Sequence, residues 1–230
     1  AQRIADTTLD RQHIGPRWEL APHLARQLLQ QPGERLVTTL DADAQRLTLA
    51  ALRRLGPTDA AAVVIDNATA DVLAYVGAPD AAQADHAAIL RSSGNLLLPF
   101  VYGIAIERRQ LTAATLLDDS LSNHAPTNPD ERLWVSARRA LGESLSEPSQ
   151  TVLRMVGEQL PERFRVADLD VGRSGQADLG LLAIAGLYRS LGNGGLWLAP
   201  RSTPGGERVA RRMLRPEAGF IVGDILTELD

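Results

Sequence analysis

A single β-hairpin early in the chain most constrains the fold, because the rest of the sequence is mainly helical. Residues 60–66 (AAAVVID) and 71–77 (DVLAYVG) are short apolar runs, separated by the turn residues 67–69 (NAT). This pattern predicts two antiparallel strands. A two-stranded sheet is marginally stable alone, and its open edges invite pairing with further strands. We therefore expect an α/β (α+β), helix-rich fold whose central antiparallel sheet is incomplete.

Helical patterns fill most of the remaining chain. Asp41 is suited to cap a helix over residues 45–55. Within that helix, Leu47, Leu52 and Leu55 line one apolar face. The other predicted helices span residues 23–29, 96–109, 135–144, 149–156, 177–191 and 216–229, with Pro148 between the third and the fourth. Residues 1–33 contain several prolines and read as a lead-in or linker segment before a domain over residues 34–230.

The composition excludes several classes of protein. Only 4% of the 230 residues are aromatic, so a folded core must be aliphatic. A net charge of -4 argues against nucleic acid, whose binding needs a basic face. The chain has no cysteine, which excludes disulfides and thiolate sites. No apolar run approaches the ~20 residues that span a bilayer. Because the chain begins at Ala1 without a signal-peptide pattern, we expect any signal or anchor upstream.

The chain also has no lysine, since all 24 of its Lys and Arg residues are arginines. Arginine does not lose its proton near neutral pH, so every mechanism that needs a deprotonated amine is excluded. The histidines lack metal-ligand spacing; they are His13, His23, His86 and His124. We therefore expect neither a metal nor a cofactor.

Several segments, taken in order, resemble one protein family. They are residues 38–41 (TTLD), 61–77 (AAVVIDNATADVLAYVG), 94–100 (GNLLLPF), 111–120 (LTAATLLDDS) and 135–148 (VSARRALGESLSEP). Together they resemble the transpeptidase domain of class A penicillin-binding proteins, closest to the penicillin-binding protein 1C subgroup. The resemblance implies a penicillin-binding/β-lactamase-like transpeptidase fold, located in the periplasm or cell envelope.

The resemblance also implies a site built on three motifs, and this sequence departs from each of them. In Ser-x-x-Lys, a serine attacks the substrate after the lysine helps to remove its proton. Asn95 and Leu98 occupy those two positions here. In Ser-x-Asn, Ser144 remains but Ser146 replaces the asparagine. The Lys-Thr-Gly motif, and with it the C-terminal strand region that carries it, is absent. The implied site is a vestigial cleft without catalytic residues.

Each of these positions also has a structural interpretation. Asn95 is suited to cap the N-terminus of a helix. Leu98 is suited to a core or to an apolar cleft. Ser144 and Ser146 lie near a helix end, where serine is common in caps and turns.

The motif losses predict a non-catalytic domain, a pseudoenzyme that acts as a binding or scaffolding module in peptidoglycan and cell-envelope biology. One alternative is a serine transpeptidase or acyl-hydrolase with a rearranged site that uses Ser93 or Ser144. Another is the transpeptidase-like part of a bifunctional peptidoglycan glycosyltransferase, in which residues 1–33 connect the two domains.

The expected partners follow from the same reasoning. They are a peptidoglycan-synthesis or other envelope protein, or a second copy of this chain bound through an exposed sheet edge; no nucleic acid and no membrane span are expected. Three explanations fit the incomplete sheet. The chain is a fragment of a longer protein, or its N-terminal segment or residues 196–214 complete the sheet, or a partner strand does so.

Overall fold

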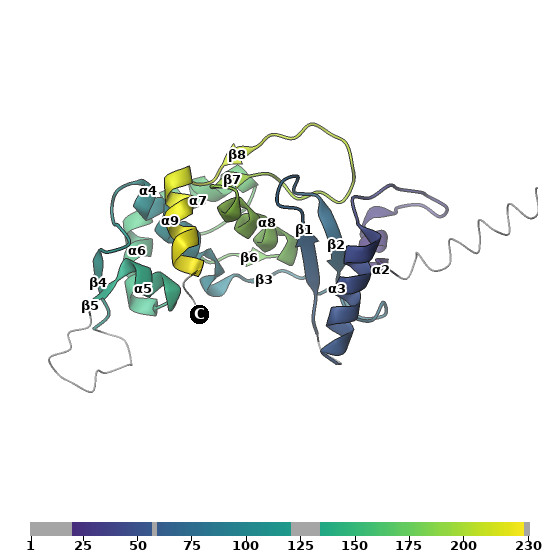
Figure 1. The fold of residues 1–230 in the computed structure, drawn as a ribbon, viewed down its shortest axis with the longest axis horizontal. Coiled ribbons are helices and arrows are strands. Elements are labelled where there is room, and N and C mark those ends of the chain that lie inside the picture. The colour runs from purple at the N-terminus through teal and green to yellow at the C-terminus, as the bar shows by residue number, and fades with distance from the viewer. Residues whose placement is uncertain (1–19, 57–58, 121–133, 228–230) are drawn as a thin grey trace, which may run out of the picture. The chain divides into compact units, whose positions relative to one another are not determined.

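The computed structural model of the chain describes residues 20–56, 59–120 and 134–227 (Figure 1). The chain forms two compact units. The first unit contains the residues up to Leu90, together with Gly180–Gly186 and Pro200–Glu207. The second unit contains Arg91–Leu179, Leu187–Ala199 and the residues from Arg208 onward. Helices predominate and the sheets are small, so the expected α/β (α+β), helix-rich class is confirmed.

The predicted hairpin is present in the first unit. Strands β1 (Ala62–Ile65) and β2 (Val72–Val76) pair antiparallel. At the turn between them, the Asp66 carboxylate accepts a hydrogen bond of 2.6 Å from the backbone N–H of Thr69. A short polar side chain that bonds the backbone in this way is typical of a tight turn, which explains the break between the two apolar runs.

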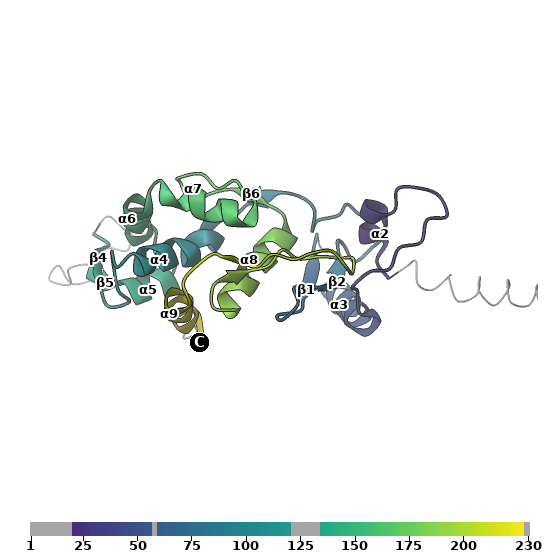
Figure 2. The same ribbon diagram turned by 90° about the horizontal axis from the view of Figure 1, so that it is seen from above.

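Two helices of the first unit pack against β2 (Figures 1 and 2). They are α2 (Pro22–Leu28) and α3 (Ala42–Arg54). Helix α3 begins where the sequence predicts because the Asp41 carboxylate caps it, accepting hydrogen bonds from the backbone N–H groups of Asp43 and Ala44 at 3.0 and 2.8 Å.

The buried face of α3 differs from the predicted one. Leu47 and Leu55 are 72% and 64% exposed, whereas Leu52 is buried. The helix instead turns Gln45 inward, where its Nε2 donates to the Tyr75 carbonyl at 3.0 Å and its Oε1 accepts from the Tyr75 N–H at 2.7 Å. Because a buried amide must keep its hydrogen bonds, Gln45 fixes the rotation of the helix and leaves two leucines in solvent.

Other segments of the first unit cover the outer edge of β2. The Val72 N–H donates to the Arg201 carbonyl at 2.8 Å, and the Arg201 N–H donates to the Ala70 carbonyl at 3.1 Å. The Asp41 N–H donates to the Leu73 carbonyl at 2.9 Å. The N-terminal segment therefore joins this edge through one backbone hydrogen bond, and the later segment joins it through a parallel bridge between Asp71 and Arg201; neither forms a full strand there. Within the described residues, the outer edge of β1 has no such backbone partner.

The second unit is mainly helical. Its helices are α4 (Leu98–Glu107), α5 (Ala137–Gly142), α6 (Ser146–Val156), α7 (Gln159–Phe164) and α9 (Pro216–Thr227), with the 3-10 turns η1 (Gly94–Leu97) and η2 (Arg165–Ala167). Helix α8 (Leu181–Gly192) begins in the first unit and ends in the second. The short strands pair antiparallel as β3 (Arg91–Ser92) with β6 (Asp178–Leu179), β4 (Leu116–Asp118) with β5 (Trp134–Ser136), and β7 (Leu196–Trp197) with β8 (Arg211–Arg212).

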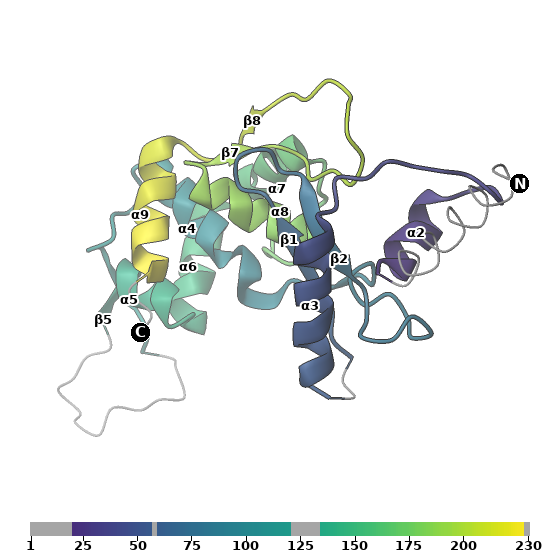
Figure 3. The same ribbon diagram turned by 45° about the vertical axis from the view of Figure 1, so that its right-hand side comes forward.

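Helix α4 forms the centre of the core in the second unit. Residues 98–105 are all buried, and the helix packs against α6 and α9 (Figure 3). The ring of Phe100 meets the ring of Phe164 edge-on, with 5.6 Å between centroids. A Cβ at Gly103 would lie 2.6 Å from Cδ1 of Leu214, so a larger residue in the middle of the helix would have to displace that leucine side chain.

Three predicted helix boundaries are wrong. The helix predicted from residue 177 begins only at Leu181, because Asp178 and Leu179 form strand β6. Pro148 does not separate two helices, because α6 begins at Ser146 and contains Pro148 in its first turn. The N–H groups of the first turn have no partner within a helix, so proline, which lacks an N–H, is tolerated there. Val135 lies in strand β5 rather than in a helix, since it pairs with Leu117 of β4.

The predicted boundary at residue 33 stays a prediction. Before it, Leu24 of α2 is buried in a hydrophobic cluster with Val72 and Tyr75 of β2.

Among the helices of the described ranges, none has both the length and the apolar character needed to cross a bilayer.

Candidate functional site

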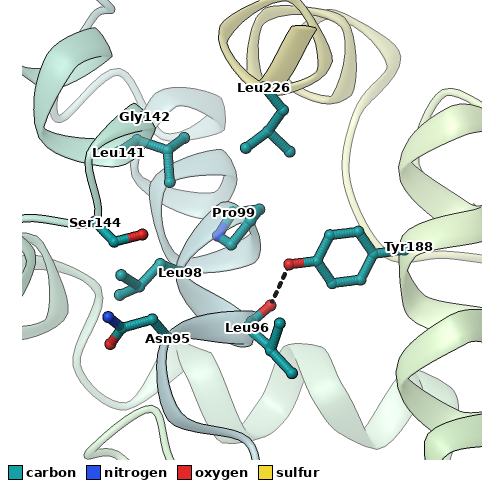
Figure 4. A pocket seen from close by; sticks show the side chains of 9 residues that line it. All are labelled: Asn95, Leu96, Leu98, Pro99, Leu141, Gly142, Ser144, Tyr188 and Leu226. Carbon is teal, nitrogen blue, oxygen red and sulfur yellow. Dashed lines mark hydrogen bonds between the residues drawn. The ribbon is translucent and has the colours of Figure 1, made fainter. Parts of the chain in front are cut away.

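Three of the four residues predicted for the cleft line one pocket of the second unit (Figure 4). These are Asn95, Leu98 and Ser144; Ser146, the first residue of α6, is not among the lining residues. The pocket has a volume of about 590 Å³, and its other lining residues are Leu96, Pro99, Leu141, Gly142, Tyr188 and Leu226. The structure therefore brings together two sequence segments that lie more than forty residues apart.

The turn η1 and helix α4 place Asn95 and Leu98 on the same side of the chain. Turn η1 leads directly into α4, and the Leu98 N–H donates to the Asn95 carbonyl, so the two residues lie one turn apart. Pro99 stands at the start of α4, where its fixed φ suits the first turn. Helix formation thus presents both side chains to the pocket.

The prediction that Asn95 caps a helix is wrong. Residue Ser93 precedes η1 and Leu97 precedes α4, and neither the turn nor the helix has a side-chain cap. The reason is local geometry: η1 continues into α4, so Asn95 lies inside the turn rather than before the helix. Its side chain is exposed on the pocket wall.

Ser93, the other nucleophile that the sequence offered, does not line the pocket. It is 2% exposed, and its Oγ accepts a hydrogen bond of 3.1 Å from the backbone N–H of Ala177. The Ser93 N–H in turn donates to the Ala177 carbonyl at 2.8 Å. Ser93 therefore holds the chain next to the β3–β6 pair, which is a structural role.

Ser144 occupies the tight connection between α5 and α6. Its φ of 52° lies in the left-handed region, which is uncommon for a residue other than glycine or asparagine. The Ser144 N–H donates to the Leu141 carbonyl at 3.1 Å, and the Leu145 N–H donates to the Ala140 carbonyl at 2.9 Å. These bonds satisfy carbonyls at the end of α5 and turn the Ser144 hydroxyl toward the pocket (Figure 4).

Tyr188 is a pocket residue that the sequence did not reveal, because it comes from a helix more than ninety residues after Asn95. Its hydroxyl donates to the Leu96 carbonyl at 3.0 Å. Burial raises the pKa of the Tyr188 phenol. The phenol therefore stays neutral at physiological pH, and among the described residues that line the pocket no other has an ionisable side chain.

The opposite end of α4 carries charge. The Glu107 carboxylate accepts hydrogen bonds from Arg163 Nη2 at 2.7 Å and Nη1 at 3.0 Å, and from the Arg215 N–H at 2.8 Å. Arg163 Nη1 also donates to the Met213 carbonyl at 2.7 Å. Burial of the Glu107 carboxyl disfavours its charged form, but the hydrogen bonds from Arg163 and Arg215 outweigh this, so the pKa of Glu107 lies below its usual range. We call these residues the Glu107 cluster.

No metal site is found in the described part of the chain, which holds no group of three or more His, Cys, Asp or Glu side chains that could bind an ion. His23 is buried with its Nε2 3.1 Å from the Gln83 carbonyl, and His86 lies 3.4 Å from Asp59. His13 and His124 lie outside the described residues.

Comparison with known proteins agrees with this geometry. Penicillin-binding protein 1C of Escherichia coli (strain K12) is 32% identical to this chain over 171 residues. A structure of penicillin-binding protein A from Mycobacterium tuberculosis, an imipenem acyl-enzyme complex, superposes with a TM-score of 0.70 over 84% of this chain and 62% of that protein, at 19% identity. The chain belongs to the penicillin-binding transpeptidase domains. Its helix-rich α/β architecture is the fold of this domain type.

Two further solved structures share the fold of this penicillin-binding transpeptidase domain. The penicillin-binding protein PonA1 from Mycobacterium tuberculosis has a TM-score of 0.66 and 17% identity, over 91% of this chain and 68% of that protein. A peptidoglycan glycosyltransferase from Burkholderia ambifaria has a TM-score of 0.65 and 17% identity, over 83% of this chain and 73% of that protein. No family model matches the chain. The alignment with penicillin-binding protein 1C covers 67% of this chain but 22% of that relative.

Proposed function

We propose that this penicillin-binding transpeptidase domain is non-catalytic and acts as a binding or scaffolding module in the periplasm, in peptidoglycan or cell-envelope biology. One observation carries the proposal. The pocket holds Asn95 and Leu98 one turn apart, where the family has a nucleophile and a lysine, and no side chain among its described lining residues accepts a proton at neutral pH.

Acyl transfer by serine needs a base within hydrogen-bond reach of the hydroxyl. Ser144 supplies a hydroxyl in the pocket, but the ionisable side chain there is the Tyr188 phenol, whose pKa is raised by burial. A neutral phenol whose O–H donates a hydrogen bond to the Leu96 carbonyl is a poor base. This arrangement supports the non-catalytic proposal over a rearranged active site.

A fluorescent penicillin tests the proposal. The full chain and an active penicillin-binding protein are each incubated with the reagent, and both are analysed by intact-mass spectrometry. We expect the active protein to gain one acyl adduct and this chain to gain none. A stoichiometric adduct that Ser144→Ala removes would instead identify a rearranged serine enzyme.

A second proposal concerns the longer protein. The relative is named penicillin-binding protein 1C, this chain matches 22% of its length, and one structure that shares the fold is a peptidoglycan glycosyltransferase. These observations support a domain that is the transpeptidase-like part of a bifunctional peptidoglycan glycosyltransferase. The open reading frame around the coding sequence tests this, since a fused glycosyltransferase domain is expected upstream.

A further inference from the structure

Two polar side chains of the pocket are available to a ligand. Within the described residues, neither the side-chain amide of Asn95 nor the hydroxyl of Ser144 makes a hydrogen bond to protein, and both residues are exposed. Figure 4 shows them beside Leu98 on one side of the pocket. Each offers both a donor and an acceptor, which is the combination that a peptide group requires.

The remainder of the pocket is apolar and uncharged. Figure 4 shows Leu226 across the pocket from the polar pair, Pro99 between Leu226 and Leu98, and Leu141 beside Ser144. A volume of about 590 Å³ lies within the ~300–1,000 Å³ of ligand sites, which are mostly apolar with a few placed polar groups. An anion bound here would lose water without gaining a cation from the lining, which is unfavourable.

We propose that this pocket binds an uncharged segment of a partner polypeptide. An apolar side chain of the partner packs against Leu98 and Leu226, and Asn95 and Ser144 hydrogen-bond to the adjacent peptide group. The hydrogen-bond pair favours a peptide over a glycan, since the apolar walls leave sugar hydroxyls unpaired. This inference rests on the proposed non-catalytic function, and it makes the occupant of the former cleft a neutral chain segment rather than a carboxylate-bearing one.

A matched pair of peptides tests the inference. Acetyl-Ala-Leu-amide is neutral, and acetyl-Ala-Leu with a free carboxylate carries the same side chain and one negative charge. Each is titrated into the full chain and followed by ¹H–¹⁵N NMR. We expect the neutral peptide to shift resonances of the pocket and to bind at least about fivefold more tightly, because the buried carboxylate finds no partner.

Two variants locate the binding. Leu226→Trp enlarges a side chain that points into the pocket and is expected to abolish the shifts, whereas Leu116→Trp, at a 59% exposed leucine of β4 outside the pocket, leaves them unchanged. Equal or tighter binding of the carboxylate, binding that survives Leu226→Trp in a folded protein, or no binding of either peptide each overturns the inference. None of these results bears on the proposed non-catalytic function, which fails only if the fluorescent penicillin forms a covalent adduct with this chain.

Discussion

The two ends of helix α4 treat charge in opposite ways. At the C-terminal end, Glu107 and Arg163 form a largely buried ion pair joined by two hydrogen bonds. At the N-terminal end, Asn95 and Leu98 face a pocket whose lining carries no charge. The Glu107 side chain is 10% exposed whereas Asn95 is exposed, so the charge lies at the more buried of the two ends. The domain therefore keeps charge where an ion pair joins its elements, and the lack of charge beside Asn95 and Leu98 is what our proposal of a non-catalytic domain rests on.

The largest predicted effect comes from breaking the charged end. Glu107→Ala leaves the Arg163 guanidinium and the Arg215 N–H without their shared acceptor. We expect a loss of about 2–3 kcal/mol in the free energy of unfolding. Urea denaturation measures it, with Glu143→Ala as the control. Glu143 pairs with Arg139 on the surface, so we expect Glu143→Ala to lower the free energy of unfolding by less than about 0.5 kcal/mol. Equal losses would show that the Glu107 cluster does not hold the unit together.

The pH dependence of stability separates the two ends further. The pKa of Glu107 is lowered in the folded state from its ordinary value of 4.5. Its stabilisation is therefore fully present above that value and is lost as the pH falls through the folded pKa. The unfolding free energy of wild type should exceed that of Glu107→Gln most near pH ~7, and the difference should shrink toward pH ~3. A difference that stays constant with pH would contradict the lowered pKa.

The smallest predicted effect is at the neutral end. Asn95 makes no capping bond, so Asn95→Ala should change the free energy of unfolding by less than about 0.5 kcal/mol. Ser136→Ala is the matched control. The Ser136 hydroxyl caps α5 by accepting from the Arg139 N–H at 3.2 Å, and its removal should cost about 1 kcal/mol. If the two variants lose equal stability, Asn95 has a structural role after all.

Local patterns predicted the elements better than their faces. The hairpin and the Asp41 cap follow from short-range chemistry, and both are present. The buried face of α3 could not be predicted from leucine spacing, because the buried hydrogen bonds of Gln45 with Tyr75 set the rotation. A polar residue with a distant backbone partner has no local signature, so tertiary contacts decide in such cases.

The candidate site shows the same division. The three-residue spacing of Asn95 and Leu98 predicted that they share a face, because they lie within one helical turn. Only the family resemblance predicted that Ser144 lies beside them, since no local sequence pattern joins the two segments. Tyr188 and Leu226 were missed, because nothing in an apolar helix marks which residue reaches a pocket built by another helix.

Gln45 also has a kinetic consequence. Its side chain bonds both backbone groups of Tyr75, so α3 cannot leave the hairpin without stranding an N–H and a carbonyl at once. Helix and strand should therefore open as one cooperative unit. In native-state hydrogen exchange, the amide proton of Tyr75 should be as slow as the slowest amides of α3, although it lies next to the edge of a two-stranded sheet.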